Sequence, residues 1–109
     1  MNITINKEGD INIVSLEGRL DTTNYGELEH QLSSMTDNNE KNILLDLEKL
    51  EYVSSSGLRI LLMFLKKIKT MEGRFMLCSM TADIKEIFEI SGFINIFEIY
   101  DNSDSALKS

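Results

Sequence analysis

Short runs of apolar residues divide the chain into segments with the period of a strand or of a helix. Apolar and polar residues alternate over residues 2–6 and again over residues 11–16. The turn Glu8-Gly9-Asp10 separates the two runs. Two alternating runs about a short turn that contains glycine predict a β-hairpin. Residues 18–23 are predicted to form a loop after it.

Three segments carry apolar residues at helical spacing. Serine, threonine and asparagine stand where such helices begin, and glycine or polar residues stand where they end. The predicted helices cover about residues 24–34, the stretch from Ser55 or Ser56 to about Met71, and the stretch from the cap Thr81 to Gly92.

Three further short runs suit strands. Ile43-Leu44-Leu45 lies within residues 42–47 and is continuously apolar, as in a strand that is covered on both faces. Residues 74–78 and 96–100 are predicted to be the other two strands. Residues 48–53 are predicted to be a loop or half-turn, and the polar residues 101–109 a short helix or a frayed tail.

The predicted order is ββαβαβαβ, with room for a final short helix. Strands that alternate with helices after an opening hairpin imply an α/β fold with a mixed, mostly parallel sheet covered by helices. The chain has 109 residues, no proline and no repeat or linker. We therefore expect a single domain over residues 1–109.

Charge and composition narrow the function. The formal net charge is -7 at pH 7, which disfavours binding to nucleic acid and to anionic membranes. The single cysteine, Cys78, cannot form a disulfide within the chain and is predicted to be a buried thiol. No signal peptide and no run long enough to span a bilayer are present, so we expect a cytoplasmic protein.

The residue patterns of common catalytic sites are missing. One histidine, His30, and one cysteine cannot build a zinc cluster. There is no glycine-rich phosphate loop and no nucleophile elbow. We therefore expect no enzyme activity, no cofactor and no metal.

Ser54-Ser55-Ser56-Gly57 opens the second predicted helix. One serine there serves as an N-cap, which stabilises a helix by about 1 kcal/mol. Three serines exceed that need. A helix N-terminus also favours anions, so a phosphate on a serine there would be tolerated by the fold. The phosphate would add roughly -1.5 to -2 charge to the surface. Residues alone leave both interpretations open.

The stretch Asp46-Leu-Glu-Lys-Leu-Glu-Tyr-Val-Ser-Ser-Ser-Gly-Leu-Arg59 resembles the signature of STAS domains, in particular the anti-sigma factor antagonists. So does Gly18-Arg-Leu-Asp21, and the predicted element order agrees along the whole chain. In that family the domain binds an anti-sigma factor that is also a serine kinase, which frees a sigma factor. Phosphorylation of a serine at the helix start abolishes binding, and a PP2C-type phosphatase restores it.

The resemblance implies a role for individual positions. The family pattern is commonly Asp-Ser-Ser-Gly-Leu, with the first serine phosphorylated. Counting back from Gly57 makes that serine Ser55, with Ser54 and Ser56 as alternatives, and Ser54 stands where many antagonists have aspartate. The partner-binding residues implied beside it are Asp21, Thr22, Ser54, Ser56, Gly57, Arg59, Ile60, Met63 and Phe64.

Two of these assignments carry an alternative. Thr22 and Thr23 can cap the first helix in place of contacting a partner. Ile60, Met63 and Phe64 lie beside the apolar stripe of the second helix, and they form either an exposed strip that docks a partner or part of a helix sunk deep in the core.

Three functions remain open, and the first two are implied by the family resemblance. The leading hypothesis is a phosphorylation-controlled antagonist of an anti-sigma factor kinase, present as a monomer or weak dimer. The second is a non-switching STAS module in a stress-sensing or lipid-transport assembly, in which the serines are only caps. The third is an enzyme or a small-ligand binder, for which the resemblance suggests a nucleotide, although no phosphate-cradling loop is present.

Overall fold

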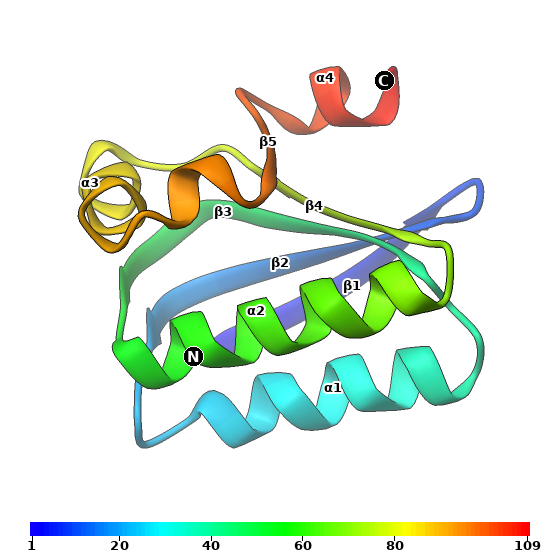
Figure 1. Ribbon diagram of the computed structural model, residues 1–109, viewed down its shortest axis with the longest axis horizontal. Helices are drawn as coiled ribbons and strands as arrows, with labels where there is room; N and C mark the ends of the chain where they lie inside the picture. Colours follow the sequence, from blue (N-terminus) through cyan, green and yellow to red (C-terminus); the bar gives the residue numbers. More distant parts are fainter.

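The computed structural model describes residues Met1 to Ser109 and contains a five-stranded sheet with helices on both faces (Figure 1). The strands lie in the order β1-β2-β3-β4-β5. β1 pairs antiparallel with β2, and all later neighbours pair in parallel. The predicted mixed, mostly parallel sheet is confirmed. The elements are β1 (Asn2–Glu8), β2 (Ile11–Leu20), α1 (Tyr25–Asp37), β3 (Asn42–Val53), α2 (Ser55–Thr70), β4 (Arg74–Cys78), α3 (Ala82–Ser91), the 3-10 helix η1 (Phe93–Asn95), β5 (Glu98–Tyr100) and α4 (Ser103–Leu107).

α1 and α2 lie side by side against one face of the sheet (Figure 1). α1 connects β2 to β3, and α2 connects β3 to β4, so each crossover returns the chain to the same end of the sheet. The C-terminal ends of β2 and β3 are therefore neighbours. The two helices bury their apolar stripes against inward-facing side chains of these strands, including Val14, Leu16 and Leu45.

β2 and β3 both extend beyond their predicted ends. β2 runs to Leu20, so the predicted loop over residues 18–23 is wrong in its first half. β3 runs to Val53, so the predicted loop over residues 48–53 is wrong throughout. These extensions bring the ends of both strands to the start of α2.

Two β-bulges explain why the second half of β3 does not read as a strand. Between Ser15 and Glu17 of β2, and again between Gly18 and Arg19, β3 uses one residue more than its partner. A bulge shifts the following side chains to the other face of the strand. The inward-facing residues of this half are consequently spaced by three in place of two, and all are buried: Leu47, Leu50 and Val53.

α4 covers the opposite face of the sheet over β3, β4 and β5. Ala106 of α4 packs there against Leu44, Met76 and Cys78, all fully buried. The predicted buried position of Cys78 is confirmed. Burial raises the pKa of its thiol to about 11. None of the helices is long and apolar enough to span a bilayer.

The predicted caps of α3 are also confirmed. The Thr81 hydroxyl oxygen accepts a hydrogen bond from the backbone N–H of Ile84 at 3.3 Å. Gly92 ends the helix in the left-handed conformation, with φ of 80°, which glycine adopts without steric cost.

α3 packs beside the C-terminal half of β3 and leaves the outward face of α2 uncovered.

Candidate functional site

Only Ser54 separates the last residue of β3 from the first turn of α2, which lies beside the end of β2 (Figure 1). The backbone N–H of Ser54 donates to the carbonyl oxygen of Leu20 at 2.9 Å, which carries the β2–β3 pairing one residue further. Ser54 is the N-cap, because its Oγ accepts a hydrogen bond from the N–H of Gly57 at 3.2 Å. The first of the three serines therefore has a structural role. Aspartate caps helices equally well.

Gly57 lets α2 approach the sheet closely. A Cβ at this position would lie 2.8 Å from Leu20 Cγ and 2.8 Å from Val53 Cγ2, closer than such atoms pack. Gly57 is buried as a result. Its predicted partner contact is therefore not available in this structure, and its role is to seat the helix start on the strand ends.

The other two serines differ in exposure. Ser55 is the first residue of α2, is exposed, and its hydroxyl makes no hydrogen bond within the chain. Ser56 is half-buried. No acidic residue lies in the first turn of α2, so its free N–H groups and dipole are not offset by a carboxylate of the same helix.

Asp21 follows the last residue of β2 and neighbours the start of α2 through the Leu20–Ser54 bond. Its Oδ1 accepts hydrogen bonds from the hydroxyl of Thr23 at 2.6 Å and from the N–H of Thr23 at 3.0 Å. The hydroxyl bond is the largest of the influences that lower the pKa of this carboxyl below its usual value. Asp21 is thus a hydrogen-bonded, ionised carboxylate that follows the strand end to which Ser54 is bonded.

Neither Thr22 nor Thr23 caps α1, so the capping alternative is wrong for both. Asn24 occupies the N-cap position, and its side chain makes no capping bond. Its Oδ1 accepts from the N–H of Asp21, while its amide donates to the carbonyl of Arg19. Thr23 donates its hydrogen bonds to Asp21 instead. Thr22 is exposed, and its predicted contact with a partner stays a prediction.

Arg19 also belongs to this region, although it is not among the predicted site residues. Its Nε lies 3.7 Å from Asp21 Oδ2. Its guanidinium stacks over the ring of Tyr52, with 4.4 Å between Cζ and the ring centroid. Arg19 and Asp21 are two positions apart, so both lie on one face of the chain if that stretch is an extended strand. The sequence alone predicted a loop at residues 18–23, and this spacing became informative only because β2 continues to Leu20.

The outward face of α2 carries fewer apolar side chains than an exposed docking strip of Ile60, Met63 and Phe64 would have. Ile60 and Phe64 are buried, 6% and 1% exposed, because they pack in the main core. For these two residues the alternative of a helix sunk in the core is confirmed, and the alternative of an exposed docking strip is wrong. Met63 is 41% exposed, and Arg59 is exposed one turn before it. Of the predicted strip, only Met63 is accessible.

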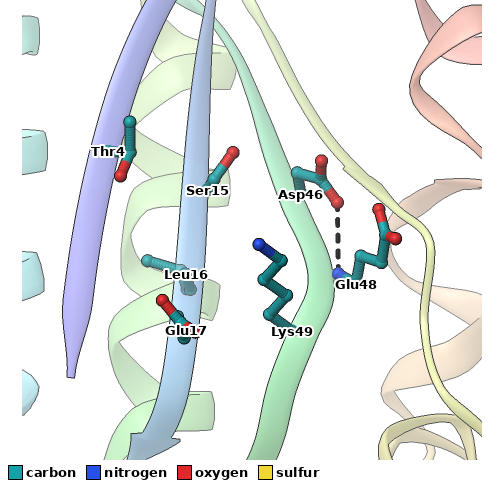
Figure 2. A pocket seen from close by; sticks show the side chains of 7 residues that line it. All are labelled: Thr4, Ser15, Leu16, Glu17, Asp46, Glu48 and Lys49. Carbon is teal, nitrogen blue, oxygen red and sulfur yellow. Dashed lines mark hydrogen bonds between the residues drawn. The ribbon is translucent and has the colours of Figure 1, made fainter.

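A polar hollow of about 230 Å³ lies elsewhere, on the sheet face away from α1 and α2 (Figure 2). Asp46 accepts a hydrogen bond there from the N–H of Glu48 at 3.1 Å. Glu17 and Lys49 complete its charged lining. None of the predicted site residues lines this hollow. No group of three or more histidine, cysteine or acidic side chains is placed to hold a metal ion.

Comparison with known proteins agrees with this geometry. The family model described as the STAS domain matches residues 2–106, nearly the whole fold. The chain belongs to the STAS domain family. Among STAS proteins, BtrV of Bordetella bronchiseptica, assigned as an anti-sigma factor antagonist, is 35% identical over 97% of this chain and 91% of its own. The anti-sigma F factor antagonist of Paenibacillus polymyxa is 30% identical over 98% of this chain and 94% of its own.

Solved STAS structures share the fold. The Thermotoga maritima protein TM1081 superposes with a TM-score of 0.93, at 20% identity, over 97% of this chain and 92% of its own. The Bacillus protein SpoIIAA, solved in its phosphorylated form, superposes with a TM-score of 0.76, at 17% identity, over 98% of this chain and 97% of its own. At these identities the likeness concerns the fold.

Proposed function

We propose that this STAS domain is an anti-sigma factor antagonist. In this proposal the unphosphorylated chain binds an anti-sigma factor serine kinase in the cytoplasm, and binding frees a sigma factor. Phosphorylation of Ser55 ends the interaction, and a PP2C-type phosphatase restores it. The relatives from Bordetella bronchiseptica and Paenibacillus polymyxa, both named as anti-sigma factor antagonists, support the class of function, and SpoIIAA has been solved in a phosphorylated form.

The observation that carries the proposal is the difference among the three serines. The oxygen of Ser54 is occupied by the capping bond to Gly57, and Ser56 is half-buried. Of the three serines, Ser55 alone is exposed and has a hydroxyl free of hydrogen bonds, and it is the first residue of the helix. A phosphate there would meet unpaired N–H groups and the positive end of the helix dipole, so the fold would accept it.

Asp21 and the exposed residues of α2 complete the proposed contact surface. Asp21 accepts a hydrogen bond from Thr23 and lies in ion-pair distance of Arg19. Arg59 and Met63 follow Ser55 along one face of α2. A phosphate beside this surface would be costly to desolvate against a partner, so binding would be lost.

The test uses the purified chain, ATP and the anti-sigma factor kinase from the same genome, with phosphorylation mapped by mass spectrometry. We expect Ser55→Ala to abolish labelling, while Ser54→Ala and Ser56→Ala remain substrates. Labelling of Ser55→Ala at the rate of the parent would refute the assignment.

A separate variant distinguishes the switching antagonist from a non-switching STAS module. Ser55→Asp places a negative charge at the site without a kinase. An antagonist should lose kinase binding in this variant, as measured by isothermal titration calorimetry. Unchanged binding of Ser55→Asp would favour the module in which the serines only cap the helix.

A further inference from the structure

The outward face of α2 is basic on an otherwise acidic protein. The chain carries a net charge of -7, yet α2 contains no aspartate or glutamate. Its four cationic residues are all exposed: Arg59, Lys66, Lys67 and Lys69. We call Arg59, Met63, Lys66 and Lys67 the basic stripe, because their spacing of three and four places them along one face of the helix.

No intramolecular partner accounts for these charges. The ion pairs of the chain involve Lys7, Arg19 and Arg74, and none involves a cation of α2. Lys67 lies 5.8 Å from the ring centroid of Phe64, which is a weak contact at an exposed site.

Helix energetics explains only part of the pattern. Lys67 and Lys69 lie in the last turn of α2, where a cation interacts favourably with the helix dipole. Arg59 lies near the N-terminal end, where the dipole offers a cation no gain, and Lys66 precedes the last turn. Their charges remain uncompensated on a surface that also exposes 41% of Met63.

We propose that the basic stripe of α2 is the docking surface for an acidic patch on the anti-sigma factor kinase. This inference rests on the proposed function and adds the chemistry of the partner surface. Charge complementarity supports an acidic protein surface as the occupant, since several free cations surround one exposed apolar side chain. The cations of the basic stripe raise the rate of association with an acidic surface and favour it over other partners. Met63 supplies apolar contact at the centre of the stripe.

The stripe also gives a physical reason for release. Ser55 lies four residues before Arg59, so the two side chains are neighbours on the helix surface. A phosphate on Ser55 can pair with Arg59 and withdraw its charge from the partner. It also adds roughly -1.5 to -2 charge at the end of the stripe, which repels an acidic surface. Phosphorylation would thus reverse the complementarity without unfolding the domain.

Two double variants with the same change in net charge test the proposal. Arg59→Glu/Lys66→Glu reverses the stripe, and Lys85→Glu/Lys108→Glu reverses two exposed lysines of α3 and the end of α4. Arginine, lysine and glutamate have similar helix propensities, so both variants should fold. Binding of the unphosphorylated chains to the kinase is measured by calorimetry at several salt concentrations, with ADP in place of ATP so that no phosphate is transferred.

We expect the stripe variant to lose at least about tenfold in affinity and most of its salt dependence, while the control stays close to the parent. Equal binding by the stripe variant and the parent would overturn the inference, and so would equal losses in both variants, which would reflect net charge alone. Failure of the parent to bind the kinase would refute the proposed function itself, and the inference with it.

A parallel measurement with vesicles of phosphatidylglycerol and phosphatidylcholine examines a different anionic surface. We expect no binding of the parent. Vesicle binding that the stripe variant loses and the control keeps would assign the stripe to a lipid surface and overturn the inference.

Discussion

The backbone N–H of Ser54 donates to the carbonyl oxygen of Leu20 at 2.9 Å, so the end of β2 is joined directly to the start of α2. Asp21 follows one of these residues and Ser55 follows the other. A carboxylate and three serines separated by more than thirty positions in the chain are thereby brought to one end of the sheet. The site depends on strand pairing as much as on its own side chains.

Removing the cap hydroxyl should destabilise the domain. Ser54→Ala loses the bond from the N–H of Gly57 and should lower the free energy of unfolding by about 1 kcal/mol. Ser54→Asp should restore it, because aspartate also caps helices. Ser55→Ala is the control and should change stability by less than about 0.5 kcal/mol, since its hydroxyl is exposed and unbonded. Urea denaturation measures all three, and equal losses in the two alanine variants would contradict the cap assignment.

A methyl group at Gly57 should force α2 away from the sheet. The added Cβ would meet Leu20 and Val53 at 2.8 Å, so Gly57→Ala should cost about 1–3 kcal/mol through overpacking. Gly26→Ala is the matched control within α1, where nothing lies within 4 Å of the new Cβ. It should stabilise the domain by up to about 1 kcal/mol, because alanine is the better helix former. A melting temperature of Gly57→Ala equal to that of the parent would contradict this prediction, because it would mean that Leu20 and Val53 move to make room for the added methyl group.

Thr23 should control the ionisation of Asp21. Thr23→Val removes the hydroxyl that donates to Oδ1, so the pKa of Asp21 should rise toward its ordinary value. Thr22→Val should leave it unchanged, because Thr22 makes no bond to this carboxylate. Carbon NMR titration of the side-chain carboxyl measures both variants.

The direction of this shift also determines its effect on stability. Since folding lowers the pKa of Asp21, its contribution is present above the ordinary aspartate pKa and is lost as the pH falls through the folded-state value. Thr23→Val should therefore flatten the acid limb of the stability curve. An unchanged Asp21 pKa in Thr23→Val would mean that the backbone N–H alone sustains the shift.

Cys78 should be inert in the folded protein. With a pKa of about 11, the thiol is almost entirely protonated at pH 8, and the thiolate is the reactive form. A thiol-exchange reagent should therefore react slowly with the native chain and rapidly after unfolding in urea. Native reactivity equal to that of the unfolded chain would contradict the burial of Cys78 beneath α4.

Arg59 should set the acidity of a phosphate on Ser55. In the phosphorylated chain, a guanidinium one turn away favours the dianion and lowers the second phosphate pKa. Arg59→Gln should raise that pKa in a phosphorus NMR titration, while Lys69→Gln, at the far end of α2, should not. Identical titrations of the parent and Arg59→Gln would show that the phosphate does not pair with this residue.

Much of the architecture follows from local patterns in the chain. Apolar spacing identified α2, and hydroxyl and glycine residues marked the ends of α3, because caps act over a few neighbouring residues. The order of strands and helices implied the parallel crossovers and the mixed sheet. The Ser54-Ser55-Ser56-Gly57 stretch located the start of α2 and, through the family resemblance, the candidate switch.

The exposure of individual side chains required the tertiary structure. Two bulges space the buried residues at the end of β3 by three positions, whereas the pattern of a regular strand has a spacing of two. These bulges result from the pairing of β3 with β2. Ile60 and Phe64 could not be assigned to core or surface from α2 alone, because their burial depends on what packs beside the helix. The sequence by itself therefore determined the elements, their order and the candidate serine, since these depend on nearby residues. Only the tertiary structure decided which side chains at the start of α2 and along its outward face are exposed, because exposure depends on contacts between residues far apart in the chain.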